Sequence, residues 1–199
     1  MKKRIAITGG IGSGKSMAGK LLREMGYPVF SCDEIYKDVL RSPEYIKKIE
    51  SYFPTVVTNG EIDRAKLAEI VFHDEGKRRT LNGLAHPLVM ETLRKEMDVC
   101  DSNLVFAEVP LLFEGNFEGE FDCILVIERE LSERVQAVQE RDHVDANAVK
   151  SRIQTQFDYR SEEGQKRIKN CNAHVIHNDG TVEALSRKLM KFIQSLSLS

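Results

Sequence analysis

Short apolar runs alternate with helical periodicity along most of this 199-residue chain. The runs are apolar at nearly every position, which is typical of strands buried on both faces. Helical patterns separate them, and this alternation predicts parallel strands joined by crossover helices. Five such runs cover residues 5–8, 28–31, 104–108, 123–127 and 173–177. We therefore expect an α/β fold with a five-stranded parallel sheet and helices on both faces.

The helix pattern is clearest after the first strand and at the end of the chain. Apolar residues at 18, 21, 22 and 25 predict one helix, and Gly26 supplies its stop signal. In the last helix Thr181 can act as the cap. Its predicted apolar face consists of Val182, Leu185, Leu189, Phe192 and Ile193.

Two long gaps between strands predict insertions. The gap after the second strand contains helical segments at 63–72 and 80–97, too much for one crossover helix. The gap after residue 127 is rich in arginine. Because no repeat or low-complexity linker separates these parts, we expect one domain over residues 1–199. Its core covers about 1–35, 100–130 and 168–199, with a helical insertion at about 36–99 and a lid segment at about 131–167.

Composition narrows the functional classes. The formal charge is −2 with no long basic run, which argues against nucleic acid as a partner. No apolar stretch is long enough to span a membrane, and the chain leads directly into the first strand without room for a signal peptide. The four cysteines form no C-x-x-C pair, so we expect buried free thiols in a reducing compartment. These features favour a cytoplasmic protein.

The most specific motif is a glycine-rich loop at residues 9–16, Gly-Gly-Ile-Gly-Ser-Gly-Lys-Ser. It fits the P-loop pattern G-x-x-x-x-G-K-S/T, and it lies between a predicted strand and a predicted helix, as that motif requires. Backbone N–H groups of such a loop point at phosphate oxygens, and the helix N-terminus favours negative charge. Lys15 is expected to reach the β- and γ-phosphates, and the Ser16 hydroxyl to bind Mg²⁺.

Two carboxylates follow predicted strands. Asp33 comes after the second strand, which we expect next to the P-loop strand, and ligands bind beyond the carboxyl ends of parallel strands. It could accept a proton or orient Mg²⁺, or it could only cap the helix that follows. Glu108 ends the third strand, where P-loop proteins keep a metal-organising carboxylate. It could also be an ordinary strand end.

Three further residues are weaker candidates. His86 precedes Pro87 inside a helical pattern, and the proline should break or kink the helix there. A kink could direct His86 at a phosphate, although a lone histidine is more often a packing residue. Arg134 and Arg141 lie seven residues apart on a helix that Ser132 can cap. An arginine of a mobile lid could bind phosphate and exclude water, or both could lie on a solvated face, and Arg141 is the preferred candidate.

Taken together, these residues resemble the dephospho-CoA kinase family. The loop with Thr8 is similar to the family's N-terminal signature, and Asp33 matches the second Asp of D-A-D. The other similarities are to H-P-L at 86–88, V-P-L-L-x-E at 109–114, the Q-R-D segment at 139–142 and N-x-G at 178–180. They follow the family's order over nearly the whole chain. The chain departs from the pattern at Ser31, Lys37, Met17 and Glu140.

The resemblance implies a P-loop NTPase fold and transfer of the ATP γ-phosphate to the ribose 3′-hydroxyl of dephospho-CoA. Asp33, Lys15 and Arg141 would be catalytic, with Mg²⁺ on Ser16. The implied ATP-binding residues are Gly10, Gly12, Ser13, Gly14, Lys15, Ser16, Met17 and Asn178. The implied acceptor-binding residues are Asp33, His86, Glu108, Pro110, Leu111 and Leu112.

Two other functions remain open, a kinase for another small acceptor and a GTP-dependent switch. The first shares the P-loop and lid segment, and only the H-P and V-P-L-L motifs argue against it. The second requires D-x-x-G and N-K-x-D segments, which the sequence lacks. The expected partners are therefore small molecules, ATP and dephospho-CoA, with no nucleic acid or membrane, and the chain would be a monomer or a weak homo-oligomer.

Overall fold

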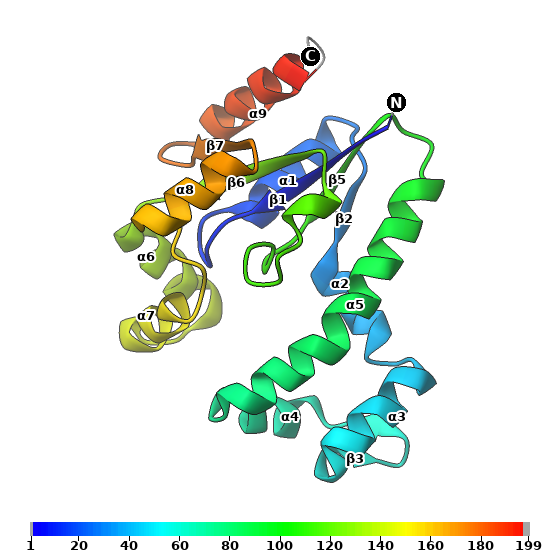
Figure 1. The fold of residues 1–199 in the computed structure, drawn as a ribbon. Coiled ribbons are helices and arrows are strands. Elements are labelled where there is room, and N and C mark those ends of the chain that lie inside the picture. Colours follow the sequence, from blue (N-terminus) through cyan, green and yellow to red (C-terminus); the bar gives the residue numbers. More distant parts are fainter. Residues whose placement is uncertain (1, 197–199) are drawn as a thin grey trace. The chain divides into compact units, whose positions relative to one another are not determined.

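The computed structural model describes residues 2–196 and divides them into two compact units (Figure 1). The first unit contains the residues up to Phe30 and from Cys100 onward, and the second contains Ser31–Val99. The boundary falls at residue 31, whereas we expected the insertion to begin at about 36. The residues of the expected lid segment group with the first unit.

A five-stranded parallel sheet forms the centre of the first unit, as predicted. Its strands all fall on the expected runs: β1 and β6 are longer than predicted by two residues and one residue, and β2 is one residue shorter. Their order in the sheet is β2 (Val29–Ser31), β5 (Leu104–Glu108), β1 (Lys3–Thr8), β6 (Cys123–Glu128) and β7 (Ala173–His177). The expectation that β2 lies next to the P-loop strand is wrong, because β5 separates β2 from β1.

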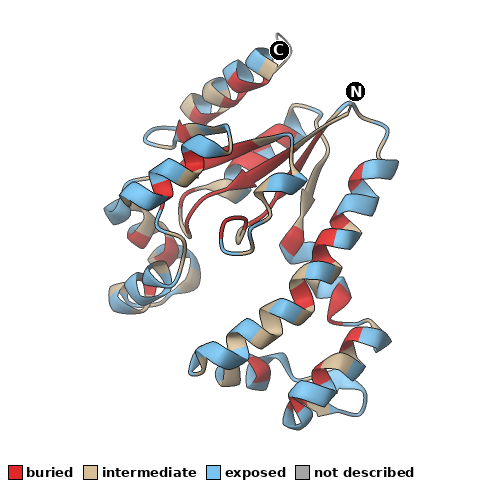
Figure 2. Cartoon of the chain, in the orientation of Figure 1, coloured by how far each residue is buried: buried red, intermediate tan, exposed pale blue. Residues whose placement is uncertain are grey.

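Helices cover both faces of this sheet (Figure 1). On one face, α1 (Lys15–Glu24) and α9 (Val182–Leu196) share a core with alternate residues of the central strands, including Ile5, Ile7 and Leu125. Helix α8 (Glu162–Asn170) and the segment that joins β5 to β6, with η2 (Glu118–Glu120), lie over the other face. Figure 2 shows the central strands β1, β5 and β6 buried over most of their length, with half-buried ends, which explains why their sequence is apolar at consecutive positions.

The arginine-rich part of the first unit forms two more helices, α6 (Leu131–Asp142) and α7 (Ala146–Gln154). The expected cap of α6 is wrong. The helix begins one residue before Ser132, and Glu130 occupies the cap position without a side-chain hydrogen bond. Val135, Val138 and Val149 form a small separate core between α6 and α7. This pair of helices is therefore held together by few apolar contacts.

The second unit is mostly helical. It contains α2 (Cys32–Val39), α3 (Pro43–Tyr52), η1 (Pro54–Val56), the antiparallel pair β3 (Val57–Thr58) and β4 (Glu61–Ile62), α4 (Arg64–Phe72) and α5 (Glu75–Val99). Sequence analysis predicted the last two helices but not the small strand pair. Tyr45 and Ile49 of α3 and Leu93 and Met97 of α5 are almost completely buried.

Helix α5 continues through Pro87, so the predicted break at His86 does not occur. Proline removes one N–H and leaves the carbonyl four residues earlier without its helical partner. That carbonyl belongs to Gly83, which is exposed and has open space around it, so water can satisfy it. The helix therefore tolerates the proline at low cost.

Two other expectations about side chains need correction. Val182 is 46% exposed and does not belong to the buried face of α9, although Thr181 caps that helix as predicted. Only Cys32 of the four cysteines is buried, and no disulfide joins any of them in the described part of the chain. Among residues 2–196, no helix combines the length and apolar character that crossing a membrane requires.

Candidate active site

The glycine-rich loop joins β1 to α1 and has the shape of a phosphate cradle. Gly14 adopts a left-handed conformation with φ of 100°, and a Cβ atom there would collide with the side chain of Asn178. The Asn178 amide donates a hydrogen bond to the Ser13 carbonyl, at 2.9 Å. Asn178, expected to bind ATP, therefore also supports the loop from the end of β7.

The Lys15 ammonium lies across the loop. Its Nζ atom donates to the carbonyl oxygens of Gly9 and Gly10, at 2.6 and 3.1 Å. These carbonyls hold the positive charge beside the glycine-rich backbone, where phosphate oxygens bind in a loop of this type. The predicted role of Lys15 is compatible with this position.

Ser16 and Glu108 lie together at the sheet edge. Glu108 accepts hydrogen bonds from Ser16 and from Arg23, the latter at 3.3 Å. Burial raises the pKa of the Glu108 carboxyl above its usual value, although Arg23, Ser16 and Lys15 act in the opposite direction. A Cβ atom at position 19 would collide with this carboxylate, so Gly19 makes room for it.

The donor set around Ser16 fits Mg²⁺. The described residues contain no group of three or more His, Cys, Asp or Glu that could hold a metal alone. Mg²⁺ usually keeps several waters and binds through one or two carboxylates together with substrate phosphates. One hydroxyl and one carboxylate beside a P-loop match that preference, with Glu108 able to act directly or through a water.

Two side chains from outside the loop hold the backbone of Ile11. The Arg134 Nε atom, on α6, donates to the Ile11 carbonyl at 2.9 Å. The Gln156 Oε1 atom accepts from the Ile11 N–H at 2.8 Å. The N–H of Ser13 is also used, by the Gly10 carbonyl at 3.1 Å. Two of the loop N–H groups expected to face phosphates thus have protein partners in this structure.

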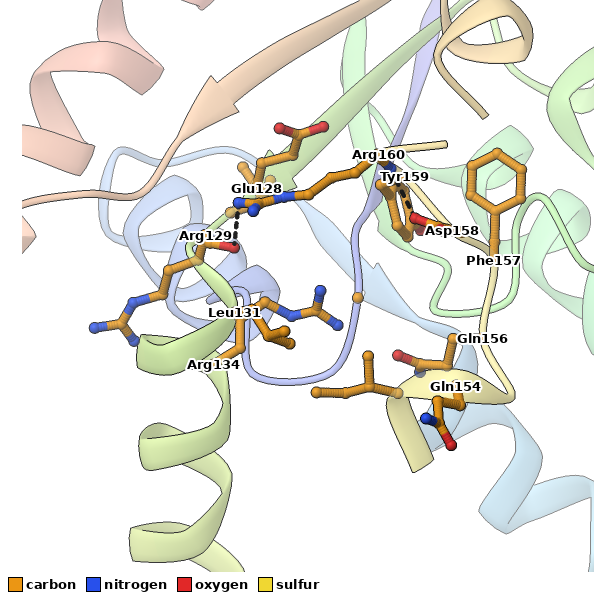
Figure 3. Close-up of a pocket in the computed structure, with 13 residues that line it drawn as sticks. Glu128, Arg129, Leu131, Arg134, Gln154, Gln156, Phe157, Asp158, Tyr159 and Arg160 are labelled. Carbon is orange, nitrogen blue, oxygen red and sulfur yellow. Dashed lines mark hydrogen bonds between the residues drawn. The ribbon is translucent and has the colours of Figure 1, made fainter. Parts of the chain in front are cut away.

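A pocket of about 350 Å³ lies beside this part of the loop (Figure 3). Its walls include Gly10, the end of β6, the start of α6 and residues 153–160. Arg129, Arg134 and Arg160 contribute positive charge, and Glu128 and Asp158 contribute negative charge. Burial and the nearby Arg160 lower the pKa of Arg134. The pocket can therefore receive a polar, charged group next to the loop.

Residues 156–160, which we call the strap, run from α7 to α8 along this pocket. The Tyr159 hydroxyl is 3.1 Å from the Thr8 hydroxyl and also hydrogen-bonds the Gly9 backbone. Burial raises the pKa of Tyr159 well above its usual value. The N–H of Phe157 donates to Glu114 Oε1 at 2.8 Å.

An aromatic cluster fixes the middle of the strap. The rings of Phe113 and Phe157 are stacked with centroids 4.4 Å apart, and Tyr159 meets both rings edge-on. The Arg167 guanidinium lies 5.4 and 5.6 Å from the two phenylalanine rings. The segment after β5 thereby holds the strap against the first unit.

The remaining predicted residues differ in their surroundings. Arg141 is exposed at the end of α6, and it is paired with Asp142, which also accepts from Arg152. Met17 is 38% exposed beside Ser16. Pro110 and Leu111 are half-buried, whereas Leu112 is completely buried and packs in the core.

Asp33 and His86 belong to the second unit. The interpretation of Asp33 as a helix cap is wrong, because Ser31 is the cap and accepts from the Glu34 N–H. Asp33 lies in the first turn of α2, is exposed, and its side chain makes no hydrogen bond or ion pair with residues 2–196. His86 is half-buried, and burial lowers its pKa below the ordinary value.

Sequence analysis ranked Arg141 above Arg134 and did not identify Gln156 or Tyr159. The structure places Arg134, Gln156 and Tyr159 at the loop. The sequence pointed to Arg134 as one of the two arginines on the predicted helix. Nothing in the sequence pointed to Gln156 or Tyr159, because their contacts with Ile11 and Thr8 span 145 and 151 positions of the chain.

Comparisons with known proteins agree with this geometry. The family model described as dephospho-CoA kinase matches residues 3–184. A dephospho-CoA kinase of Thermus thermophilus is 36% identical over 193 residues, which cover 97% of this chain and 91% of that protein.

Solved structures show the same similarity. The crystal structure of TT1252 from Thermus thermophilus has a TM-score of 0.82 and 35% identity, and the match covers 98% of both chains. A dephospho-CoA kinase from Campylobacter jejuni has a TM-score of 0.66 and 27% identity, over 99% of this chain and 98% of that one. With a family match over nearly its whole length, the chain belongs to the dephospho-CoA kinase family.

Proposed function

We propose that this chain transfers the γ-phosphoryl group of ATP to the ribose 3′-hydroxyl of dephospho-CoA, giving CoA and ADP in the last step of coenzyme A biosynthesis. The 3′-oxygen forms a bond to the γ-phosphorus while the bond to the β–γ bridging oxygen breaks, and ADP leaves with that electron pair. The observation that carries the proposal is the family match over residues 3–184. The Lys15, Ser16 and Glu108 arrangement supplies matching chemistry.

In the first unit the roles follow from position. Lys15 and the loop amides with no internal partner would hold the ATP phosphates, and Lys15 would neutralise charge on the group in transfer. Ser16 would hold Mg²⁺ with Glu108 beside it, and the ion would neutralise phosphate charge. Glu108 was expected to bind the acceptor, but its contact with Ser16 favours the metal role.

Two arginines could complete the phosphate site. Arg134 already contacts the loop. Arg141 is exposed at the far end of the same helix, so its proposed role requires the lid segment to move. We keep Arg141 as the proposed lid arginine and add Arg134 as a group that lines the pocket.

The acceptor residues that the resemblance implies keep their proposed roles. We propose that Asp33 accepts the 3′-hydroxyl proton and that His86, Pro110 and Leu111 contact the acceptor. Leu112 is completely buried, so its contribution would be to fix the neighbouring residues. Because Asp33 is not a cap and is exposed, its carboxylate is available for this chemistry. We place the enzyme in the cytoplasm, as a monomer or weak homo-oligomer.

A coupled ADP-release assay tests the reaction. The assay uses Mg·ATP with dephospho-CoA, a panel of nucleoside monophosphates, or shikimate, and the product is identified by mass. We expect turnover with dephospho-CoA alone and phosphate on the 3′-oxygen. Turnover confined to another acceptor would reject the proposed substrate, and the absence of turnover with every acceptor would reject the kinase activity.

The role of Asp33 gives a sharper prediction. Replacing it by asparagine removes the base but keeps the size, so kcat should fall by about 10²–10⁴-fold with little change in ATP binding. Asp38→Asn is a matched control, because Asp38 is on the same helix and pairs only weakly with Arg41 at the surface, at 3.7 Å. A near wild-type kcat for Asp33→Asn would contradict the base assignment.

A further inference from the structure

The glycine-rich loop is supported at two separate places. Asn178 holds the second half of the loop through the Ser13 carbonyl, next to the start of α1. The strap holds the first half, since Tyr159 contacts Thr8 and Gly9 and Gln156 contacts Ile11. Figure 3 shows Gln156 and Tyr159 on the same strap beside the loop. The two halves therefore depend on different parts of the chain.

We propose that Gln156 and Tyr159 are positioning residues, which set the backbone of Gly9–Gly10–Ile11 so that a bound nucleotide places its terminal phosphate correctly. This rests on the proposed kinase function, because the loop is assumed to hold ATP. The helix end of the loop can bind the inner phosphates without the strap. The first half lies against the pocket beside Gly10, where the terminal phosphate and its acceptor have room.

One hydrogen bond of the strap is made in a dry environment, because Thr8 is completely buried and Tyr159 is only 6% exposed. A buried polar group that loses its partner cannot bind water instead, so this bond has a strong orienting effect. The Gln156 bond to Ile11 is half-buried beside the pocket. Removing the Gln156 carbonyl would leave the Ile11 N–H without its partner and free the peptide to rotate.

The strap is itself rigidly held. Glu114 fixes the Phe157 backbone, and Phe113 stacks on the Phe157 ring. At the far end Arg160 pairs with Glu130 at 2.8 Å. The segment that follows β5 is therefore connected through the strap to the glycine-rich loop. Glu114, the last residue of the V-P-L-L-x-E motif, therefore helps to position the loop through its hydrogen bond to the strap.

Variants of Gln156 test the proposal. Gln156→Leu has a similar size but no acceptor, whereas Gln156→Glu keeps an acceptor for the Ile11 N–H. Gln194→Leu is the matched control, because Gln194 is exposed on α9 and does not line the pocket. We expect kcat to fall by about 10–100-fold in Gln156→Leu, the scale of a misplacement of about 1 Å. Gln156→Glu should recover most of kcat, and Gln194→Leu should match wild type.

Nucleotide binding supplies a readout that does not need the acceptor. Calorimetry with ADP and with a non-hydrolysable ATP analogue compares binding with and without a terminal phosphate. Gln156→Leu and Tyr159→Phe should lower affinity for the ATP analogue about tenfold, the loss of roughly one hydrogen bond to a charged group, and leave ADP affinity nearly unchanged. Tyr159→Phe keeps the ring in the aromatic cluster, so the variant should remain folded.

The outcomes separate the two proposals. If wild type does not phosphorylate dephospho-CoA, the proposed function fails, while the ADP and ATP-analogue affinities still test positioning. Equal losses for both nucleotides, or losses that follow a lowered melting temperature, would show a purely structural role and overturn the inference. A Gln156→Leu variant that behaves like Gln194→Leu would overturn it as well.

Discussion

Glu108 illustrates how much one residue depends on its surroundings. It is buried at the end of β5 and touches Ser16 and Arg23, and Lys15 is near enough to influence its charge. Burial nevertheless dominates and raises its pKa. An ionised carboxylate in this place costs stability, which a bound Mg²⁺ would offset. The fold thus keeps a charge that is useful for binding rather than for stability.

Replacing Glu108 by glutamine should reveal that cost. Because the folded-state pKa lies above the ordinary value of 4.5, the native state binds the proton more tightly than the unfolded state. The stabilising contribution of Glu108 is therefore fully present below about pH 4.5, and it is lost as the pH rises through the folded-state pKa. We expect the unfolding free energy of Glu108→Gln to rise relative to that of wild type as the pH rises from about 4.5 through the folded-state pKa.

Urea denaturation without Mg²⁺ at a series of pH values measures this difference. The other titrating groups are common to both proteins, so their effects largely cancel. A difference that stays constant with pH would contradict the raised pKa. Protection of the protein by Mg·ADP should also be weaker in Glu108→Gln, since the carboxylate beside Ser16 is missing.

At the scale of elements, helix α9 shows what an amphipathic pattern can and cannot tell. Its predicted face includes Leu185, Leu189, Phe192 and Ile193, and all four are buried. Val182 fits the same period but lies in the first turn and is exposed. Periodicity assigns a side of the helix, whereas the extent of the neighbouring core decides where burial ends.

Two neighbouring residues of α9 give a matched pair. Leu189 is completely buried against the sheet, and Met190 is 44% exposed. Leu189→Ala should lower the free energy of unfolding by about 2–5 kcal/mol, because it removes buried methyl groups and leaves a cavity. Met190→Ala should change it by about 0.5 kcal/mol or less. Similar losses in urea denaturation for the two variants would contradict the packing of α9.

The strands were predictable for a related reason. The central strands β1, β5 and β6 are short, apolar and enclosed between helices, so their burial is visible in the sequence at consecutive positions. Helix α6 begins two residues before the start that a Ser132 cap implies, and Pro87 lies inside a continuous helix. In both cases a local signal predicted a helix boundary that the observed helix does not follow.

At the scale of the whole molecule, the chain forms two compact units with distinct tasks in our proposal. The first contains the nucleotide site, and the second, Ser31–Val99, contains Asp33 and His86. A ligand that binds the native state protects the region it contacts from local opening. Hydrogen exchange can therefore assign each substrate to a unit.

We expect Mg·ADP to slow exchange mainly at the glycine-rich loop, α1 and α6. Dephospho-CoA should slow exchange mainly in Ser31–Val99 and at residues 109–111. Peptide-resolved exchange with each ligand alone is the measurement, and α9, which we place in neither site, is the internal control. Protection of the second unit by Mg·ADP alone would contradict the division of tasks.

The sequence by itself determined the features that depend on nearby residues. The glycine-rich loop, the strands, the cap of α9 and the order of the motifs are all written in short stretches of chain, because backbone preferences and periodic burial act locally. The tertiary structure alone decided that β5 separates β2 from β1 and that Arg134 reaches the loop. It also brought Gln156 and Tyr159 to Ile11 and Thr8. Such contacts join residues more than a hundred positions apart, and only the packed chain makes them neighbours.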